Sequence, residues 1–285
     1  MRNDPEVQQA LNTYQLGLPN VPIAGRSGEL LGRGTGSSLE FQEYREYAAG
    51  DDIRHLDWAA YARSDTLMVR LFREEISPRM EVLLDGSRSM TTQDGVKFRV
   101  ASQLTALLAL LSGKLGSQPR MFLLGDDSPI LPMGMELLDR LPTHECSAVS
   151  TLPELISDNA VPLKGQSVRV VVSDFLFEHD PGWLVRRLAS NSSILWLVQV
   201  LSRFEADPSQ TGGRRLIDVE SEQQLDLILN KQTIADYLRR LNYVQQELAL
   251  HCRRMHASFI TIVADDGFPK LCREELSQSG LLRAS

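Results

Sequence analysis

The chain has 285 residues, enough for one large domain or for one domain with a smaller appendage. Its 30 Lys and Arg residues against 37 Asp and Glu residues give a net charge of −7, which argues against a general nucleic-acid binder because such proteins neutralise phosphates with basic side chains. No signal segment follows Met1 and no apolar run has the length of a membrane span, so the sequence predicts a cytoplasmic protein without a membrane span.

Residues 1–38 are predicted to form a short N-terminal helix followed by a linker. Apolar residues between Val7 and Leu18 have a weak helical spacing, and proline residues follow them. The stretch 25–38 is rich in glycine, but it lacks the preceding strand and the following helix that a phosphate-binding loop requires. We therefore interpret it as a flexible connector.

Residues 39–79 are predicted to form a small β-rich lobe. Two short β-like runs, 39–47 and 67–75, flank a Gly-Asp turn at 50–51. Charges of both signs are interleaved along these runs, and most such side chains are solvated or paired locally. This stretch is therefore not a nucleic-acid patch.

Residues 80–285 alternate between strands and helices. Apolar and β-branched runs predict strands at 82–84, 120–124, 167–173, 194–201 and 258–263. Helical spacing predicts helices at 96–115, 135–141, 151–156, 181–189 and 234–248, with a hairpin strand at 129–133 and an irregular piece at 216–219. Repeated strand-helix units predict an α/β fold with a doubly wound, mainly parallel sheet and helices on both faces.

The first of these strands ends in Asp-Gly-Ser-Arg-Ser at 85–89. A tight loop would turn Asp85, Ser87 and Ser89 toward one point, and such oxygen ligands suit Mg2+ or Mn2+. The third strand ends at Asp174, and ligands of such sheets bind beyond the carboxyl ends of the strands. We therefore expect both carboxylates in one crevice, although the same residues also fit a loop that caps a helix.

Cys146, Cys252 and Cys272 are odd in number and widely spaced, which is typical of reduced thiols and not of a disulfide framework. Cys252 and His256 stand one helical turn apart, as in a zinc pair. Because no second pair at ligand spacing accompanies them, we interpret these residues as structural.

The Asp-x-Ser-x-Ser strand end resembles the metal-ion-dependent adhesion site of von Willebrand factor A domains. More narrowly, Gly-Asp-Asp-Ile-Arg at 50–54, Leu-Asp-Trp at 56–58 and Ala-Arg at 62–63 resemble the bacterial family known as domain of unknown function fifty-eight. The resemblance implies a von Willebrand factor A-like fold with a small N-terminal lobe. It also implies that Mg2+ or Mn2+ is held by Asp85, Ser87, Ser89, Thr151 and Asp174, with Ser147 or Ser150 as alternatives to Thr151.

Members of that family accompany MoxR-type AAA+ ATPases. The resemblance therefore implies a protein-binding module, not an enzyme, that acts with such an ATPase and with other von Willebrand factor A-like proteins in chaperone-like assembly or maturation of client proteins. An acidic residue of the partner would complete the metal site.

Two alternatives stay open. The first is a Mg2+-dependent phosphohydrolase with Asp85 as nucleophile. Such enzymes usually have a second Asp two residues after the nucleophile, and this chain has Ser87 at that position. The second is a metal-free structural scaffold in which the hydroxyl groups only cap a helix.

Overall fold

A computed structural model of the chain describes residues 1–18, 39–48, 56–74, 79–91, 94–126, 132–157, 161–208, 212–217 and 224–285. The chain divides into two units, of which one comprises Met1–Ile23 with Pro78–Ser285 and the other Ala24–Ser77. The larger unit is called here the α/β unit and the smaller one the small unit. The division of the sequence at residues 38 and 79 stays a prediction.

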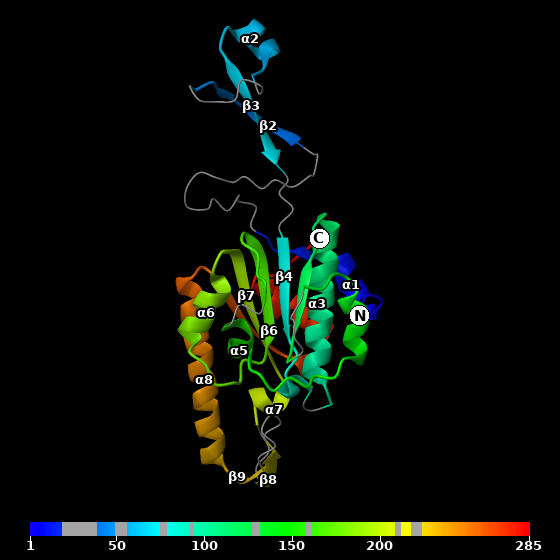
Figure 1. Cartoon of the computed structure of the whole chain (residues 1–285), viewed down its shortest axis with the longest axis vertical. Coiled ribbons are helices and arrows are strands. Elements are labelled where there is room, and N and C mark those ends of the chain that lie inside the picture. Colours follow the sequence, from blue (N-terminus) through cyan, green and yellow to red (C-terminus); the bar gives the residue numbers. More distant parts are fainter. Residues whose placement is uncertain are drawn as a thin grey trace. The chain divides into compact units, whose positions relative to one another are not determined.

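A five-stranded sheet forms the centre of the α/β unit, and all its strands are parallel (Figure 1). Their order across the sheet is β10-β7-β6-β4-β5. The strands are β4 (Arg79–Asp85), β5 (Arg120–Leu124), β6 (Ser167–Ser173), β7 (Ser192–Leu201) and β10 (Ser258–Val263). Every residue of β6 is buried, as expected for a strand that is covered on both faces. The predicted parallel sheet is confirmed.

Helices cover both faces of this sheet because its strand residues point alternately to opposite sides. Val82 and Leu84 of β4 pack in one core cluster with residues of α1 (Pro5–Thr13) and α3 (Val96–Lys114). Leu83 packs in a second cluster with residues of α5 (Leu152–Ser157), α6 (Pro181–Ala189) and α8 (Lys231–Arg254). The sheet is therefore doubly wound, as predicted and as in a von Willebrand factor A-like fold.

Short elements complete the α/β unit. They are α4 (Leu137–Arg140), α7 (Arg203–Ala206), α9 (Phe268–Arg273), α10 (Glu275–Gln278) and the antiparallel pair of β8 (Gly212–Ile217) and β9 (Gln224–Leu229). The prediction of an irregular piece at 216–219 is wrong for residues 216 and 217, which form part of β8, whereas 218 and 219 lie outside the described residues. Of the predicted hairpin strand at 129–133, residues 129–131 lie outside the described residues, and Met133 forms one antiparallel bridge with Met121.

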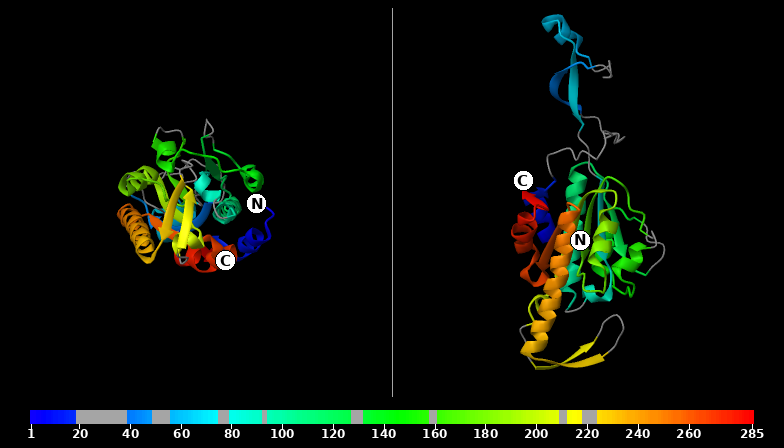
Figure 2. Two further views of the ribbon diagram at one scale, coloured as in Figure 1. Left: turned by 90° about the horizontal axis from the view of Figure 1, so that it is seen from below. Right: turned by 90° about the vertical axis from the view of Figure 1, so that its left-hand side faces the viewer.

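The two ends of the chain pair with each other. The N-terminal helix ends at Thr13, earlier than the spacing up to Leu18 predicted, because β1 (Tyr14–Leu16) pairs with β11 (Leu282–Ala284). Such a distant partner is invisible to a local pattern. Figure 2 shows that α1 lies beside the C-terminal elements, and Val7, Leu271 and Leu282 belong to the same core cluster.

The small unit contains an antiparallel ribbon of β2 (Leu39–Glu46) and β3 (Met68–Glu74) and the helix α2 (Trp58–Ser64). Asp57 caps α2, because its Oδ1 accepts hydrogen bonds from the backbone N–H groups of Ala59 and Ala60. The hydroxyl of Tyr44 on β2 donates to the other oxygen of this carboxylate at 2.8 Å. The Leu-Asp-Trp motif therefore joins the helix to the ribbon, whereas 49–55 and the glycine-rich 25–38 lie outside the described residues.

No helix in the described part of the chain is both long and apolar enough to span a membrane.

Candidate metal site at the carboxyl edge of the sheet

The edge of the sheet between β4 and β6 is where the strand order predicts a ligand site. From β4 the chain moves to β5 on one side and then crosses to β6 on the other, so the winding direction reverses between β4 and β6. Ligands of open α/β sheets bind at such a reversal, beyond the carboxyl ends of the strands. Asp85 is the last residue of β4, and Asp174 directly follows β6. The topology therefore brings both predicted acids to the same edge.

The turn after Asp85 passes close to the neighbouring strand. The Gly86 N–H donates to the backbone oxygen of Leu124 on β5 at 2.8 Å. A Cβ atom at position 86 would lie 2.6 Å from the same oxygen, so no larger residue fits without displacing β5. Glycine here lets the loop turn back over the strand ends and present Ser87 beside Asp85.

The Asp85 carboxylate is buried and held from two sides. Its Oδ1 accepts from the Ser87 N–H at 2.9 Å, and its Oδ2 accepts from the Ser173 hydroxyl at 2.5 Å. Burial raises the pKa of Asp85, and the nearby charge of Asp174 raises it further. A bound cation would offset both effects, since it stabilises the charged form of the carboxylate.

The two predicted serine ligands lie side by side. Ser87 Oγ and Ser89 Oγ are 3.0 Å apart, with Ser89 in a 3-10 turn, Arg88–Thr91. Two neighbouring ligands of an octahedral Mg2+, each about 2.1 Å from the ion, are also about 3.0 Å apart. The spacing of the hydroxyl groups and the adjacent carboxylate therefore fit such an ion.

Asp174 is held by a side chain that the sequence analysis missed. Its Oδ2 accepts from Lys97 Nζ at 2.9 Å, and its Oδ1 accepts from the Leu176 N–H at 3.1 Å. Lys97 lies in the first turn of α3 and is fully buried, and it also donates to Glu205 at 2.6 Å. The sequence contained a signal that Lys97 is buried, because this residue lies on the same face of the helix as the buried Ala101, four residues later.

Thr151 lies at the start of α5, and its hydroxyl and N–H both donate to one oxygen of Glu154, at 2.9 and 2.6 Å. The contact of the Thr151 N–H with the Glu154 side chain is the glutamate half of a capping box and places Thr151 at the N-cap position of α5, the alternative considered for this residue, while its hydroxyl donates to the same oxygen. Its role as a metal ligand stays a prediction, and the hydroxyl can keep its hydrogen bond to Glu154 while a lone pair of its oxygen faces an ion.

The loop before Thr151 nevertheless adjoins the serine turn. Arg88 N–H donates to the backbone oxygen of Ala148 at 3.3 Å, and Ala148 N–H donates to Gly86 at 3.4 Å. Asp126, beyond β5, accepts from the N–H groups of Val149 and Ser150. Hydrogen bonds from these two residues lower the pKa of Asp126. Ser150 therefore already has a partner for its side chain.

Other metal chemistry has no comparable support. Among the described residues, no three or more His, Cys, Asp and Glu side chains are grouped to hold an ion, so a zinc site or a carboxylate cage is absent from that part. Cys146, Cys252 and Cys272 are buried free thiols, and burial raises the pKa of each to about 12.

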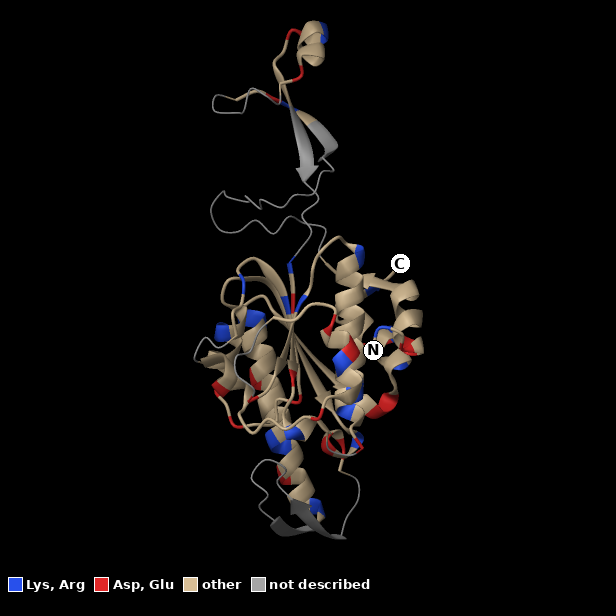
Figure 3. Cartoon of the chain, turned by 45° about the vertical axis from the view of Figure 1, so that its right-hand side comes forward, with Lys and Arg blue, Asp and Glu red and all other residues tan. Residues whose placement is uncertain are grey.

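Lys and Arg positions are interspersed with Asp and Glu positions in the described part of the α/β unit (Figure 3).

Together the fold and this edge define a doubly wound α/β protein with an oxygen-lined site at the reversal of its sheet. The family model described as "Protein of unknown function DUF58" matches residues 43–247. The chain therefore belongs to that family, as the motifs in the sequence predicted.

Related proteins and solved structures match this chain over most of its length. Uncharacterised proteins of Mycobacterium bovis and Mycobacterium tuberculosis are 24% identical over 279 residues, covering 92% of this chain and 86% of theirs. An aerotolerance-related membrane protein from Bacteroides fragilis matches with 13% identity and a TM-score of 0.39 over 70% of this chain and 99% of that one. The conserved hypothetical protein BatB from Bacteroides thetaiotaomicron matches with 14% identity and a TM-score of 0.39, covering 71% and 98%.

Proposed function

We propose that this chain is a metal-dependent protein-binding module without enzymatic activity. Asp85, Ser87 and Ser89 hold Mg2+ or Mn2+, and the 3.0 Å spacing of the two serine hydroxyls carries the proposal. Asp174 joins directly or through water, and Thr151 joins through a lone pair of its hydroxyl oxygen.

The ligand types explain why such a site would bind a protein. Serine and threonine hydroxyls are neutral, so they add no negative charge to that of Asp85, and a divalent ion keeps positive charge that the site does not compensate. An ion in that state favours a further carboxylate ligand at its open position. The module therefore recognises an Asp or Glu side chain of a partner.

A MoxR-type AAA+ ATPase is the proposed partner, with other von Willebrand factor A-like proteins as further ones. The family resemblance supports this proposal, in which the chain acts in chaperone-like assembly or maturation of client proteins in the cytoplasm. The ATPase supplies energy, and the module supplies recognition.

Phosphohydrolase chemistry is disfavoured by the surroundings of Asp85. Both of its carboxylate oxygens accept hydrogen bonds, and burial favours its protonated form, which is a poor nucleophile. Steady turnover of p-nitrophenyl phosphate in Mg2+, lost in Asp85→Ala, would replace the binding module with an enzyme.

Calorimetric titration of Mg2+ into chelator-treated protein tests the metal. We expect binding by the wild type and by a control, Asp139→Ala with Ser117→Ala, which changes the same residue types outside the site. Asp85→Ala with Ser87→Ala should not bind while keeping its circular dichroism spectrum. Equal binding by this variant would mean that the ion binds at another site, and the absence of binding by the wild type would overturn the proposal.

The partner is tested with a purified MoxR-type ATPase from the same organism. Association should require Mg2+, disappear with chelator and fail in the Asp85→Ala, Ser87→Ala variant. Trp58→Ala probes the small unit, where this side chain is 64% exposed. Association that persists in chelator but is lost in Trp58→Ala would assign recognition to the small unit instead.

A further inference from the structure

A buried ammonium group stands beside the proposed metal site. Lys97 Nζ lies 2.9 Å from Asp174 Oδ2 and 2.6 Å from Glu205 Oε1, and the lysine side chain is fully buried. A lysine seldom occupies such a position without paired charges, because burial alone disfavours its charged form. Here the two carboxylates keep the ammonium charged, and their coulombic attraction raises the pKa of Lys97 against the opposing effect of burial.

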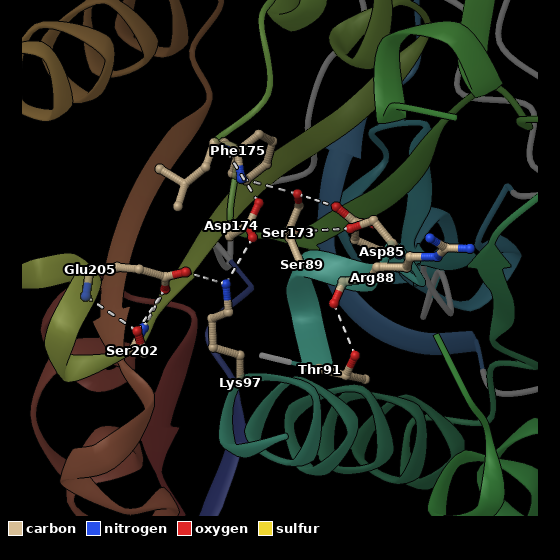
Figure 4. A network of polar contacts seen from close by, with 12 residues as sticks. Asp85, Arg88, Ser89, Thr91, Lys97, Ser173, Asp174, Phe175, Ser202 and Glu205 are labelled. Atoms are coloured by element: carbon tan, nitrogen blue, oxygen red, sulfur yellow. Dashed lines mark hydrogen bonds and ion pairs between the residues drawn. The ribbon is translucent and has the colours of Figure 1, made fainter. Parts of the chain in front are cut away.

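Glu205 is itself fixed in place. Its Oε2 accepts from the N–H and the hydroxyl of Ser202, at 2.8 and 2.9 Å, in the capping box of α7. The Tyr237 hydroxyl on α8 donates to its backbone oxygen at 2.8 Å. The other carboxylate oxygen, Oε1, is thereby presented to Lys97. Figure 4 shows Lys97 between Glu205 and Asp174.

The charges at this edge determine what a metal would encounter. Within the described part of the chain, the Asp85 oxygens accept from a serine N–H and a serine hydroxyl and form no ion pair with a basic side chain. The charge of Asp174 is offset by Lys97. A cation at the serine pair would therefore meet one uncompensated carboxylate and one that is already paired.

We propose that Lys97 is a positioning residue that keeps Asp174 paired and out of direct metal contact, so that the bound ion retains an open position and positive charge for a carboxylate of a partner. This inference rests on the proposed function. It assigns Lys97 a specificity role: it weakens the metal site in order to strengthen recognition of the partner. Without Lys97, Asp174 would complete the ion from within the chain.

The test compares three variants in Mg2+ titrations with and without acetate as a carboxylate probe. In Lys97→Met we expect Mg2+ to bind at least tenfold more tightly, because the site gains one unit of negative charge. Acetate should tighten Mg2+ binding to the wild type and have no such effect on Lys97→Met. Lys97→Arg, which keeps the charge, should behave as the wild type.

Glu205→Gln supplies the opposite change. With a neutral side chain at position 205, the positive charge of Lys97 is paired with Asp174 alone. The negative charge near the ion is therefore lower, and Mg2+ should bind several times more weakly. This variant keeps the buried lysine paired and remains informative if Lys97→Met does not fold. A purely structural role of Lys97 predicts weaker binding in Lys97→Met as well.

The inference and the proposed function fail differently. If the wild type binds Mg2+ but Lys97→Met binds it no more tightly, or Glu205→Gln leaves the affinity unchanged, the role of Lys97 is refuted and the metal site stands. If the wild type does not bind Mg2+, the proposed function fails and the inference fails with it.

Discussion

Glu81 is expected to be the most sensitive charged residue of the α/β unit. It is fully buried at the start of β4 and accepts hydrogen bonds from Arg169, Arg120, Ser167 and the N–H of Lys164. Arg169 is also fully buried, whereas the side chain of Arg120 is 21% exposed. Glu81→Ala leaves the Arg169 charge without its carboxylate, and removing one partner of a buried pair costs about 3–5 kcal/mol.

This cost is measurable by heat or urea. For a domain of 150–250 residues, each kcal/mol lowers the melting temperature by about 2–4 °C, so Glu81→Ala should lose about 6–20 °C. Arg120→Met, at the partly exposed partner, should cost less, about 1 kcal/mol. In an Arg169→Met background the cost of Glu81→Ala should fall by at least about 1 kcal/mol, since the two side chains interact directly.

The result also provides a control for the metal site. Glu81 precedes Asp85 by four residues, which is about 13 Å along a strand. Glu81→Ala should therefore leave the Mg2+ affinity of the folded protein unchanged. A loss of stability below about 1 kcal/mol, or an unchanged cost in the Arg169→Met background, would refute the reasoning about this buried pair.

Four further predictions concern single groups. The raised pKa of Asp85 means that the folded metal-free protein keeps the carboxyl proton to a higher pH than the unfolded chain does. The stability that this protonated carboxyl contributes is therefore present below the pKa of the unfolded chain and is lost as the pH rises through the pKa of the folded protein. Mg2+ displaces the proton, so the calorimetric affinity should rise across the same window, and a flat profile would contradict this. Thr151→Ala removes the hydrogen bond from the hydroxyl to Glu154, so it should cost about 1 kcal/mol in urea unfolding and weaken Mg2+ binding, whereas a loss of affinity only in Ser150→Ala would reassign the ligand. Asp57→Ala should cost about 1–2 kcal/mol and expose α2 to limited proteolysis, and an unchanged digestion pattern would argue against its capping role. With pKa values of about 12, the three thiols should resist iodoacetamide at pH 8 until the protein is unfolded, and rapid native labelling would contradict their burial.

Much of the sheet could be predicted from the sequence because its strands are continuous apolar runs between polar turns. Residues 120–124, 167–173 and 258–263 were predicted with the bounds that the structure shows. Repeated strand-helix units then imply a parallel sheet, which brings strand ends to one edge. The proximity of Asp85 and Asp174 follows from these two rules.

The remaining features depend on distant partners that no local pattern reveals. Tyr14–Leu16 forms a strand only because the C-terminal residues lie beside it. Lys97 belongs to the site because Asp174 and Glu205 approach it from positions 77 and 108 residues later in the chain. The hydroxyl of Thr151 was equally compatible with a ligand and a cap, and its contact with Glu154 appears only once α5 is formed.

Anomalous diffraction from crystals soaked in Mn2+ tests the central claim most directly. We expect a single strong peak at direct coordination distance from Ser87 Oγ and Ser89 Oγ, with Asp85 adjacent and Lys97 still paired with Asp174. The peak should be absent in the Asp85→Ala, Ser87→Ala variant. A peak away from these hydroxyl groups, or none at saturating Mn2+, would contradict a metal-dependent module at this edge of the sheet.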